Sequence, residues 1–130
     1  MSGLDIRPLL RSGILSLAPE TPIRRAVALL VEARTPAAAV IAENGALAGI
    51  LTQKDCFRPA LHASYHQEWA GTVADHMTRA VVTIDAGTDL AGAAEMFLAS
   101  PHRVFPAMDG ARLVGLLHRS DVLAALVRAG

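Results

Sequence analysis

Two short stretches of the chain place a side chain that can hydrogen bond three residues before an aspartate. Residues 49–55 read GILTQKD and residues 115–121 read GLLHRSD, so Thr52 and His118 occupy matching positions. A hydroxyl followed three residues later by a carboxylate is typical of a helix capping box, where the carboxylate also lies in the positive field of the helix N-terminus. The same groups can bind a ligand, because a carboxylate accepts hydrogen bonds from hydroxyls and free helix N–H groups bind phosphate.

Capping alone explains Thr52 and Asp55 but does not explain the second stretch. Histidine is a poor N-cap residue, yet Asp121 still follows His118 at the same spacing. An aspartate that persists without its capping partner indicates a further role. Both interpretations, helix capping and ligand binding, therefore stay open at this point.

The two stretches belong to an internal repeat. Residues 6–42 align with residues 73–109 at an offset of 67, with apolar positions coinciding almost throughout, and Gly49 then aligns with Gly115 at an offset of 66. Two copies are too few for a solenoid, so we predict an α/β fold in which two β-α-β-β-α repeats pack as a pseudo-twofold pair. The expected elements are strand 14–17, helix 22–34, strands 37–42 and 46–51 and a helix from Thr52, then strand 81–84, helix 89–99, strands 104–108 and 112–117 and a helix from His118.

Local sequence patterns predict where these helices begin and end. Thr21 and Thr88 are predicted N-caps of the first helix in each copy, with Pro22 at the first helical position. Pro59 lies about two turns into the second helix of the first copy, where it removes a backbone donor. We therefore expect that helix to kink or restart there, giving a helical extension over 59–71.

The composition excludes several classes of partner. Hydrophobic residues make up 52% of the 130 residues, and twelve basic residues balance twelve acidic ones. A balanced charge gives no long-range attraction to nucleic acid or to an anionic membrane, and no apolar run approaches the roughly 18 residues of a membrane span. The single cysteine, Cys56, excludes an internal disulfide and fits a reducing compartment. We therefore expect a cytoplasmic protein that binds neither nucleic acid nor membrane.

The sequence offers little support for catalysis or for a metal site. His62 and His66 are four residues apart, but no third ligand is evident, so a solvated helix face is the preferred interpretation. Cys56 lies in the first turn of a helix, where a thiolate would be favoured, although a buried structural cysteine is the expected role. No serine or cysteine has a base and an orienting acid suggested by its surroundings. We therefore predict a protein that is not an enzyme and has no metal and no obligatory cofactor.

The order of elements and the two Gly-apolar-apolar-x-x-x-Asp stretches resemble a tandem pair of CBS domains, the cystathionine-β-synthase-type regulatory motif. Residues 72–84, TVADHMTRAVVTI, resemble the linker and first strand of the family, and residues 103–117, RVFPAMDGARLVGLL, resemble its central hairpin. The resemblance divides the chain into a first repeat, 6–61, with its helical extension over 59–71, and a second repeat, 72–127.

The resemblance implies a small-molecule sensor. In the family, two copies pack through their sheets and leave two clefts, which typically hold an adenosine compound such as AMP, ADP, ATP or S-adenosylmethionine. A stand-alone regulatory module of this kind would bind an adenine nucleotide or nucleoside, signal to an unidentified partner protein by a population shift, and form a homodimer. The main alternative is a ligand-free dimerisation or scaffolding module with degenerate clefts. A metal- or redox-responsive protein using His62, His66 or Cys56 is a further alternative.

Carried onto this sequence, the family pattern assigns Asp55 and Asp121 to the ribose hydroxyls. In the first cleft it assigns the phosphate to Thr52 with help from Lys54, and the base to Ser16, Leu17, Pro36, Ala37 and Ala38. In the second cleft it assigns the base to Thr83, Ile84, Val104, Phe105 and Pro106, with possible cations at His102, Arg103 and Arg119. His118 stands where the family has Thr or Ser, so phosphate binding there is either lost or tuned by pH. The additional cations favour the second cleft.

Overall fold

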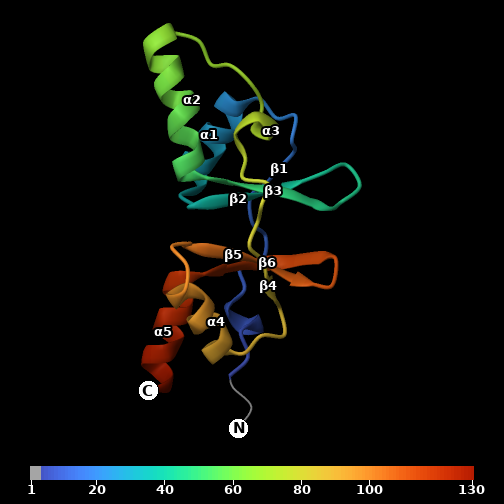
Figure 1. Ribbon diagram of the computed structural model, residues 1–130, viewed down its shortest axis with the longest axis vertical. Coiled ribbons are helices and arrows are strands. Elements are labelled where there is room, and N and C mark those ends of the chain that lie inside the picture. The colour runs from blue at the N-terminus through green and yellow to red at the C-terminus, as the bar shows by residue number, and fades with distance from the viewer. Residues whose placement is uncertain (1–3) are drawn as a thin grey trace. The chain divides into compact units, whose positions relative to one another are not determined.

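A computed structural model describes residues 4–130, which form two compact units (Figure 1). The Asp55 unit comprises residues 15–81. It contains β1 (Ser16–Leu17), α1 (Ile23–Ala33), β2 (Ala37–Ile41), β3 (Leu47–Thr52), α2 (Gln53–His66) and α3 (Val73–His76). The Asp121 unit joins the described residues up to Ile14 to residues 82–130. It contains the short 3-10 helix η1 (Arg7–Leu9), β4 (Ile84–Asp85), α4 (Leu90–Leu98), β5 (Val104–Asp109), β6 (Arg112–His118) and α5 (Arg119–Ala129).

Each unit is built on a three-stranded sheet of the same topology. The strand orders are β1-β2-β3 and β4-β5-β6, with a parallel first pair and an antiparallel hairpin as the second pair. Both hairpins shift register at the same place, between Val40 and Ile41 and between Ala107 and Met108. The predicted α/β class and the two β-α-β-β-α repeats are confirmed.

The structural units do not coincide with the contiguous repeats of the sequence. In the Asp121 unit, the Leu90 N–H donates to the carbonyl of Leu4 at 2.7 Å, which holds Leu4 beside the start of α4. In the Asp55 unit, the Val73 N–H donates to the carbonyl of Thr21 at 2.9 Å, which holds α3 beside the start of α1. Each segment that precedes the first strand of one repeat therefore packs in the unit that contains the other repeat.

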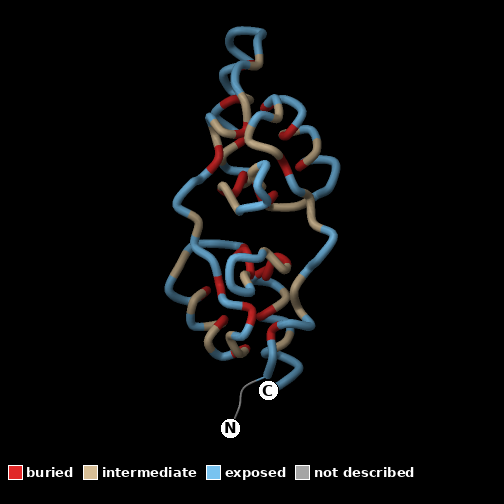
Figure 2. Tube along the Cα trace, turned by 90° about the vertical axis from the view of Figure 1, so that its right-hand side faces the viewer, coloured by how far each residue is buried: buried red, intermediate tan, exposed pale blue. Residues whose placement is uncertain are grey.

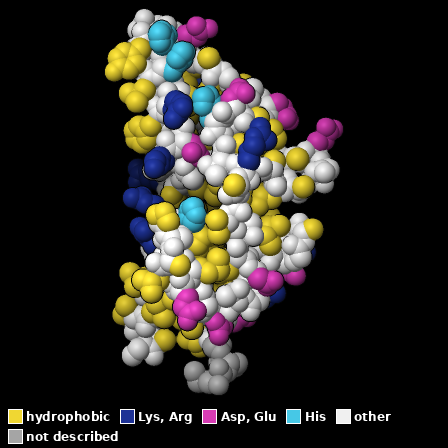
Figure 3. All heavy atoms as spheres, viewed as in Figure 1, with side chains coloured by type: hydrophobic (Ala, Val, Ile, Leu, Met, Phe, Trp, Pro, Cys, Tyr) yellow, Lys and Arg dark blue, Asp and Glu magenta, His cyan; other side chains and the backbone are white. Residues whose placement is uncertain are grey.

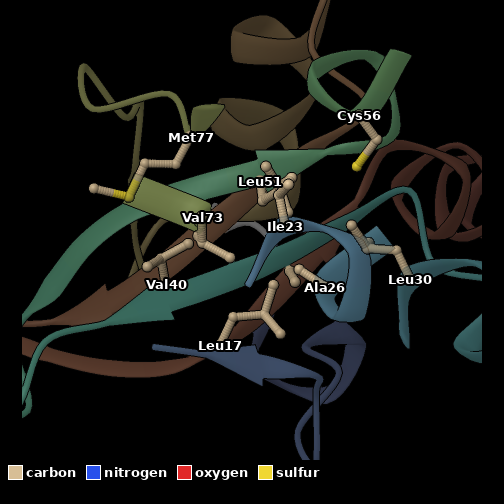
Figure 4. Close-up of a cluster of buried hydrophobic side chains, with 10 residues drawn as sticks. Leu17, Ile23, Ala26, Leu30, Val40, Leu51, Cys56, Val73 and Met77 are labelled. Carbon is tan, nitrogen blue, oxygen red and sulfur yellow. The ribbon is translucent and has the colours of Figure 1, made fainter. Parts of the chain in front are cut away.

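Each unit has its own hydrophobic core, and buried positions occur in both (Figure 2). In the Asp55 unit, Leu17, Val40 and Leu51 from the sheet meet Ile23, Ala26 and Leu30 from α1 together with Val73 and Met77 (Figure 4). In the Asp121 unit, the rings of Phe97 and Phe105 stack with centroids 4.4 Å apart. The small side chains of Ala37, Ala38 and Ala39 on β2 of the Asp55 unit are all buried.

The predicted N-caps of the first helix in each repeat are wrong by one residue. Pro22, and not Thr21, occupies the N-cap of α1, and it offers no side-chain oxygen. Asp89, and not Thr88, caps α4, where its Oδ1 accepts a hydrogen bond from the Gly92 N–H at 2.8 Å. Aspartate is at least as good a cap as threonine, so the sequence alone does not decide between neighbouring candidates.

The second helix of the first copy is predicted to kink or restart at Pro59, and the restart is wrong. α2 runs without interruption from Gln53 to His66, with Pro59 inside it and buried. It ends where Gln67 adopts a left-handed conformation with φ 51°, so the expected helical extension over 59–71 stops short of Gly71. Burial of the proline ring offsets the loss of one backbone hydrogen bond, which is how a helix tolerates this residue.

In each unit a short segment crosses beside the last strand of the sheet. Residues 77–78 cross at β3, where Ile50 and Thr78 exchange backbone hydrogen bonds of 2.9 and 2.8 Å. Residues 10–11 cross at β6, where Arg11 and Leu116 do the same at 2.9 and 3.0 Å. We call these two pairs of residues the crossing segments, and they are equivalent in the two units.

The crossing segments explain why both repeated stretches begin with glycine. A Cβ added to Gly49 would lie 2.7 Å from the carbonyl oxygen of Thr78 and 2.8 Å from the sulfur of Met77. A Cβ added to Gly115 would lie 3.0 Å from the carbonyl oxygen of Arg11. The first glycine therefore has no room for a side chain, and the second has little.

We expect Gly49→Ala to lower the free energy of unfolding by about 1–3 kcal/mol, because the added methyl group meets a backbone oxygen that is itself hydrogen bonded. Gly115→Ala should cost less, because its nearest contact is longer. Urea denaturation followed by circular dichroism measures both changes. A Gly49→Ala protein as stable as the wild type would show that the crossing segment is not packed tightly against β3.

Candidate functional site

Asp55 lies in the first turn of α2 and holds three hydrogen bonds through its carboxylate and backbone. Its Oδ2 accepts from the Thr52 N–H at 3.0 Å, and its own N–H donates to the Thr52 hydroxyl at 3.2 Å. The capping box predicted from the sequence is therefore present. The hydroxyl of Thr78, on the crossing segment, donates to the same carboxylate at 3.2 Å. Asp55 thus connects β3, α2 and the crossing segment.

Asp121 occupies the equivalent position in α5 but has a different partner. His118 is the N-cap of α5 and makes no capping hydrogen bond through its side chain. Arg11 instead donates to both carboxylate oxygens of Asp121, from Nε to Oδ2 at 2.8 Å and from Nη2 to Oδ1 at 3.1 Å. This is the paired, two-bond geometry that arginine forms with a carboxylate. Asp121 therefore acts as an ion-pair partner where Asp55 acts as a cap.

Arg11 and Thr78 are equivalent residues that the sequence-based site did not include. Both lie on crossing segments, and both pair with the last strand of their sheet. The evidence for them was present in the repeat, because the offset that aligns Leu10 with Met77 also aligns Arg11 with Thr78. Their importance becomes visible only when the segments are seen to reach the aspartate of the other repeat.

The electrostatics of the Asp121 site follow from this ion pair and from burial. The hydrogen bond from Arg11 holds the pKa of the Asp121 carboxyl below its usual value. Burial lowers the pKa of the His118 imidazole, and the charge of Arg11 lowers it further. His118 therefore favours its neutral form near pH 7, so it brings little positive charge to a phosphate at that pH.

The structure places all the predicted residues of each cleft in one unit, and some of them are close neighbours. Ala37 lies opposite Thr52 in the hairpin, and Val104 lies opposite His118. The start of each helix is tied to the neighbouring strand by one further bond. The Gln53 N–H donates to the carbonyl of Pro36 at 2.9 Å, and the Arg119 N–H donates to the carbonyl of Arg103 at 2.8 Å.

Four of the side chains predicted to line a base lie in the hydrophobic cores instead. Leu17 and Ala38 belong to the core of the Asp55 unit, and Ile84 and Phe105 belong to that of the Asp121 unit. Because side chains alternate along a strand, Ala37 and Val104 point to the opposite face of their sheets. Only the backbone of the four core residues remains as a candidate for contact with a ligand.

The remaining predicted residues differ in exposure. Ser16, Thr83, Lys54, His102, Arg103 and Arg119 are exposed, whereas Pro106 is buried. The ring of His102 lies edge-on to that of Phe105, with centroids 5.7 Å apart. Lys54 and Arg119 follow the N-cap of α2 and α5 closely, so their charges lie near the two aspartates along the chain.

Neither the histidine pair nor the cysteine forms an evident site. The rings of His62 and His66 lie 4.5 Å apart, and within residues 4–130 no group of three or more His, Cys, Asp or Glu side chains is placed to hold a metal ion. Cys56 is buried, and its Sγ lies 3.3 Å from the carbonyl oxygen of Thr52. Burial, with a contribution from the charge of Asp55, raises the pKa of this thiol to about 11.

The fold is a tandem pair of β-α-β-β-α repeats, each with an aspartate in the first turn of the helix that follows its hairpin. The family model described as CBS domain matches the chain twice, over residues 5–61 and 73–128, so the chain belongs to the CBS-domain family. The resemblance identified from the sequence is confirmed. No curated protein sequence matches the chain significantly.

Solved structures of similar proteins agree with this assignment. The structure of CBSX2 in complex with AMP is 26% identical in sequence, with a TM-score of 0.83 and 98% of each chain covered. CBSX2 from Arabidopsis thaliana, described as a CBS-pair protein, is 25% identical, with a TM-score of 0.82 and coverage of 98% of this chain and 97% of that one. A CBS-domain-containing protein from Agrobacterium tumefaciens is 23% identical, with a TM-score of 0.81 and 97% of each chain covered, and shares the fold. In the described part of the chain, no helix has the length and apolar character of a membrane span.

We expect the imidazole of His118 to titrate with a midpoint below 6.5 in the folded protein, because burial disfavours its charged form. Well above pH 6.5, near pH 8, His118 is neutral in both states and contributes no pH dependence. As the pH falls below 6.5, the unfolded chain binds this proton first, so the free energy of unfolding decreases. NMR titration of the ring measures the midpoint, and His118→Gln should remove this part of the acid destabilisation. A midpoint above 6.5 would contradict the assignment.

We expect Cys56 to resist alkylation while the protein is folded. At pH 8, a pKa of about 11 leaves about one thiol in a thousand ionised, and the thiolate is the reactive form. Iodoacetamide should therefore modify the folded protein at least about tenfold more slowly than the urea-unfolded chain, as followed by mass spectrometry. Equal rates in the two states would instead support a reactive cysteine and the redox-responsive alternative.

Proposed function

We propose that this chain is a regulatory module that binds an adenine nucleotide or nucleoside, with AMP as the first candidate, and passes the signal to a partner protein. The observation that carries the proposal is the Asp55 carboxylate, held in place at the start of α2 by Thr52 and Thr78. The AMP complex of CBSX2, which matches this chain over 98% of its length, supports the choice of ligand.

The Asp55 carboxylate retains the capacity to bind a ribose. An ionised carboxylate has about four acceptor positions. In Asp55 the Thr52 N–H and the Thr78 hydroxyl occupy only part of them. The Thr78 hydroxyl can rotate, so its hydrogen bond is readily exchanged. Two vicinal ribose hydroxyls are donors of suitable number and spacing for the positions that remain. The aspartate can therefore cap α2 and bind a ligand at the same time.

The start of α2 also offers groups for a phosphate. The N–H groups of Gln53 and Asp55 already donate to Pro36 and Thr52, and within residues 4–130 the Lys54 N–H has no such partner. This N–H group, the Lys54 ammonium group and the helix dipole all favour an anion. AMP, ADP and ATP share the phosphate and ribose that these groups would bind, and S-adenosylmethionine shares only the adenosine.

The signalling step and the homodimer belong to the same proposal. Large apolar side chains are exposed on α2 at Phe57, Leu61 and Tyr65 and on α5 at Leu123 and Val127 (Figure 3). Exposed apolar side chains grouped on one helix are typical of an interaction surface. We propose that such helices contact a second copy of the chain or the partner protein in the cytoplasm, and that the module acts by binding and not by catalysis.

One observation favours the alternative of a ligand-free scaffold. The Asp121 site has no capping hydrogen bond from His118, and Arg11 takes both oxygens of its carboxylate. If the Asp55 site were also unable to bind, the repeated aspartates would serve structure alone. Ligand binding by the Asp55 site is therefore the property that separates the two functions.

We expect Asp55→Asn to weaken the binding of AMP at least about tenfold in isothermal titration, because charged hydrogen bonds to the ribose are lost. The matched control is Asp75→Asn. Asp75 lies three residues after Thr72 at the start of α3, and its Oδ2 accepts from the Thr72 N–H at 2.8 Å, as Asp55 accepts from Thr52. Both variants weaken a charged hydrogen bond in the first turn of a helix, but Asp75→Asn should bind AMP normally. Unchanged binding by Asp55→Asn, or none by the wild type, would favour the scaffold.

A further inference from the structure

The two equivalent aspartates carry partners of different chemistry. Asp55 accepts a hydrogen bond from the hydroxyl of Thr78, whereas Asp121 accepts two from the guanidinium of Arg11. The backbone around the two partners is the same, because each crossing segment is fixed to its strand by two backbone hydrogen bonds. Apart from the N-cap residues Thr52 and His118, the difference between the sites therefore lies in one side chain on each crossing segment.

A hydroxyl and a guanidinium leave different capacity on the carboxylate that they contact. Threonine donates one proton, and its hydroxyl can rotate to another partner. Arginine presents a rigid fork of donors that matches both carboxylate oxygens and carries a permanent charge. A ribose diol pairs with both oxygens of a carboxylate, as the fork of Arg11 does. Arg11 holds one acceptor position on each oxygen of Asp121. A diol at Asp121 therefore competes with this rigid fork for the paired geometry, whereas a diol at Asp55 competes only with a hydroxyl that can turn.

We propose that Arg11 is a specificity-determining residue, an internal ligand of Asp121 that makes the Asp121 site the weaker of the two sites for a ribose-bearing ligand. The inference rests on the proposed function and deepens it by ranking its two sites. It also reverses the order expected from the sequence, where the additional cations favoured the second cleft. The cation that decides the ranking is Arg11, which is paired with the Asp121 carboxylate.

The ion pair is able to open, so its effect is graded. The side chain of Arg11 is 53% exposed and that of Asp121 is 29% exposed. Ion pairs at this level of exposure are screened by salt and stabilise little. We therefore expect Arg11 to weaken binding at Asp121 by about 3- to 10-fold and not to abolish it.

Exchange of the two residues between the sites tests the inference. To isolate the Asp121 site, AMP is titrated into Asp55→Asn with and without Arg11→Thr, and the second substitution should tighten binding by about 3- to 10-fold. To isolate the Asp55 site, AMP is titrated into Asp121→Asn with and without Thr78→Arg, which should weaken binding by a similar factor. Circular dichroism and thermal unfolding verify that each variant is folded.

The matched control for charge is Arg7→Thr in the Asp55→Asn background. Arg7 is exposed, lies in η1 of the same unit, and its substitution removes the same charge without touching the ion pair. Adenosine serves as a second probe, because it has the ribose but no phosphate for a lost cation to weaken. Arg11→Thr should tighten adenosine binding at least as much as AMP binding, and Arg7→Thr should change neither.

The possible outcomes separate this inference from the proposed function. Binding of AMP that is lost with Asp55→Asn but unaffected by Arg11→Thr or by Thr78→Arg would overturn the ranking and leave the proposed function standing. An equal gain from Arg7→Thr would reduce the effect of Arg11 to general charge and overturn the inference. Failure of the wild type and every variant to bind AMP or adenosine would overturn both.

Discussion

The close approach of a crossing segment to the last strand of each sheet is the constraint on which the rest of the structure depends. The approach requires glycine at 49 and leaves little room for a side chain at 115. It also fixes Thr78 and Arg11 by paired backbone hydrogen bonds, which places each side chain on the aspartate at the start of the next helix. The repeated spacing from glycine to aspartate is therefore one structural device that joins a strand, a helix and a segment from the neighbouring repeat.

The same carboxylate can have a structural role and a binding role because these roles use different acceptor positions. Asp55 accepts the Thr52 N–H at the start of α2 and still has acceptor positions for a ligand. Its other partner, the Thr78 hydroxyl, can rotate away from the carboxylate. Asp121 lacks a capping partner, and its retention in the sequence is explained by the ion pair with Arg11. The two sites differ at the N-cap, which is Thr52 or His118, and at the neighbour on the crossing segment, which is Thr78 or Arg11.

The fold could be predicted from the sequence because the repeat and the alternation of apolar residues act over many positions at once. Errors arose where one residue decides the outcome. The N-cap of α1 lies at Pro22, and α2 continues through Pro59. Each outcome depends on local packing energies that differ little between the alternatives, and a sequence pattern does not rank them. Arg11 and Thr78 were missed as site residues because they reach the aspartates of the other repeat, a contact that exists only after the chain has folded.

A crystal structure of the wild-type protein grown with AMP at less than one equivalent per chain would test the central claim most directly. The account predicts that the ribose hydroxyls lie on the Asp55 carboxylate while Arg11 remains paired with Asp121. AMP bound first at Asp121 with its ribose on the carboxylate would contradict the ranking of the sites. AMP bound with its ribose on neither aspartate would contradict the assignment of these carboxylates as ligand-binding groups.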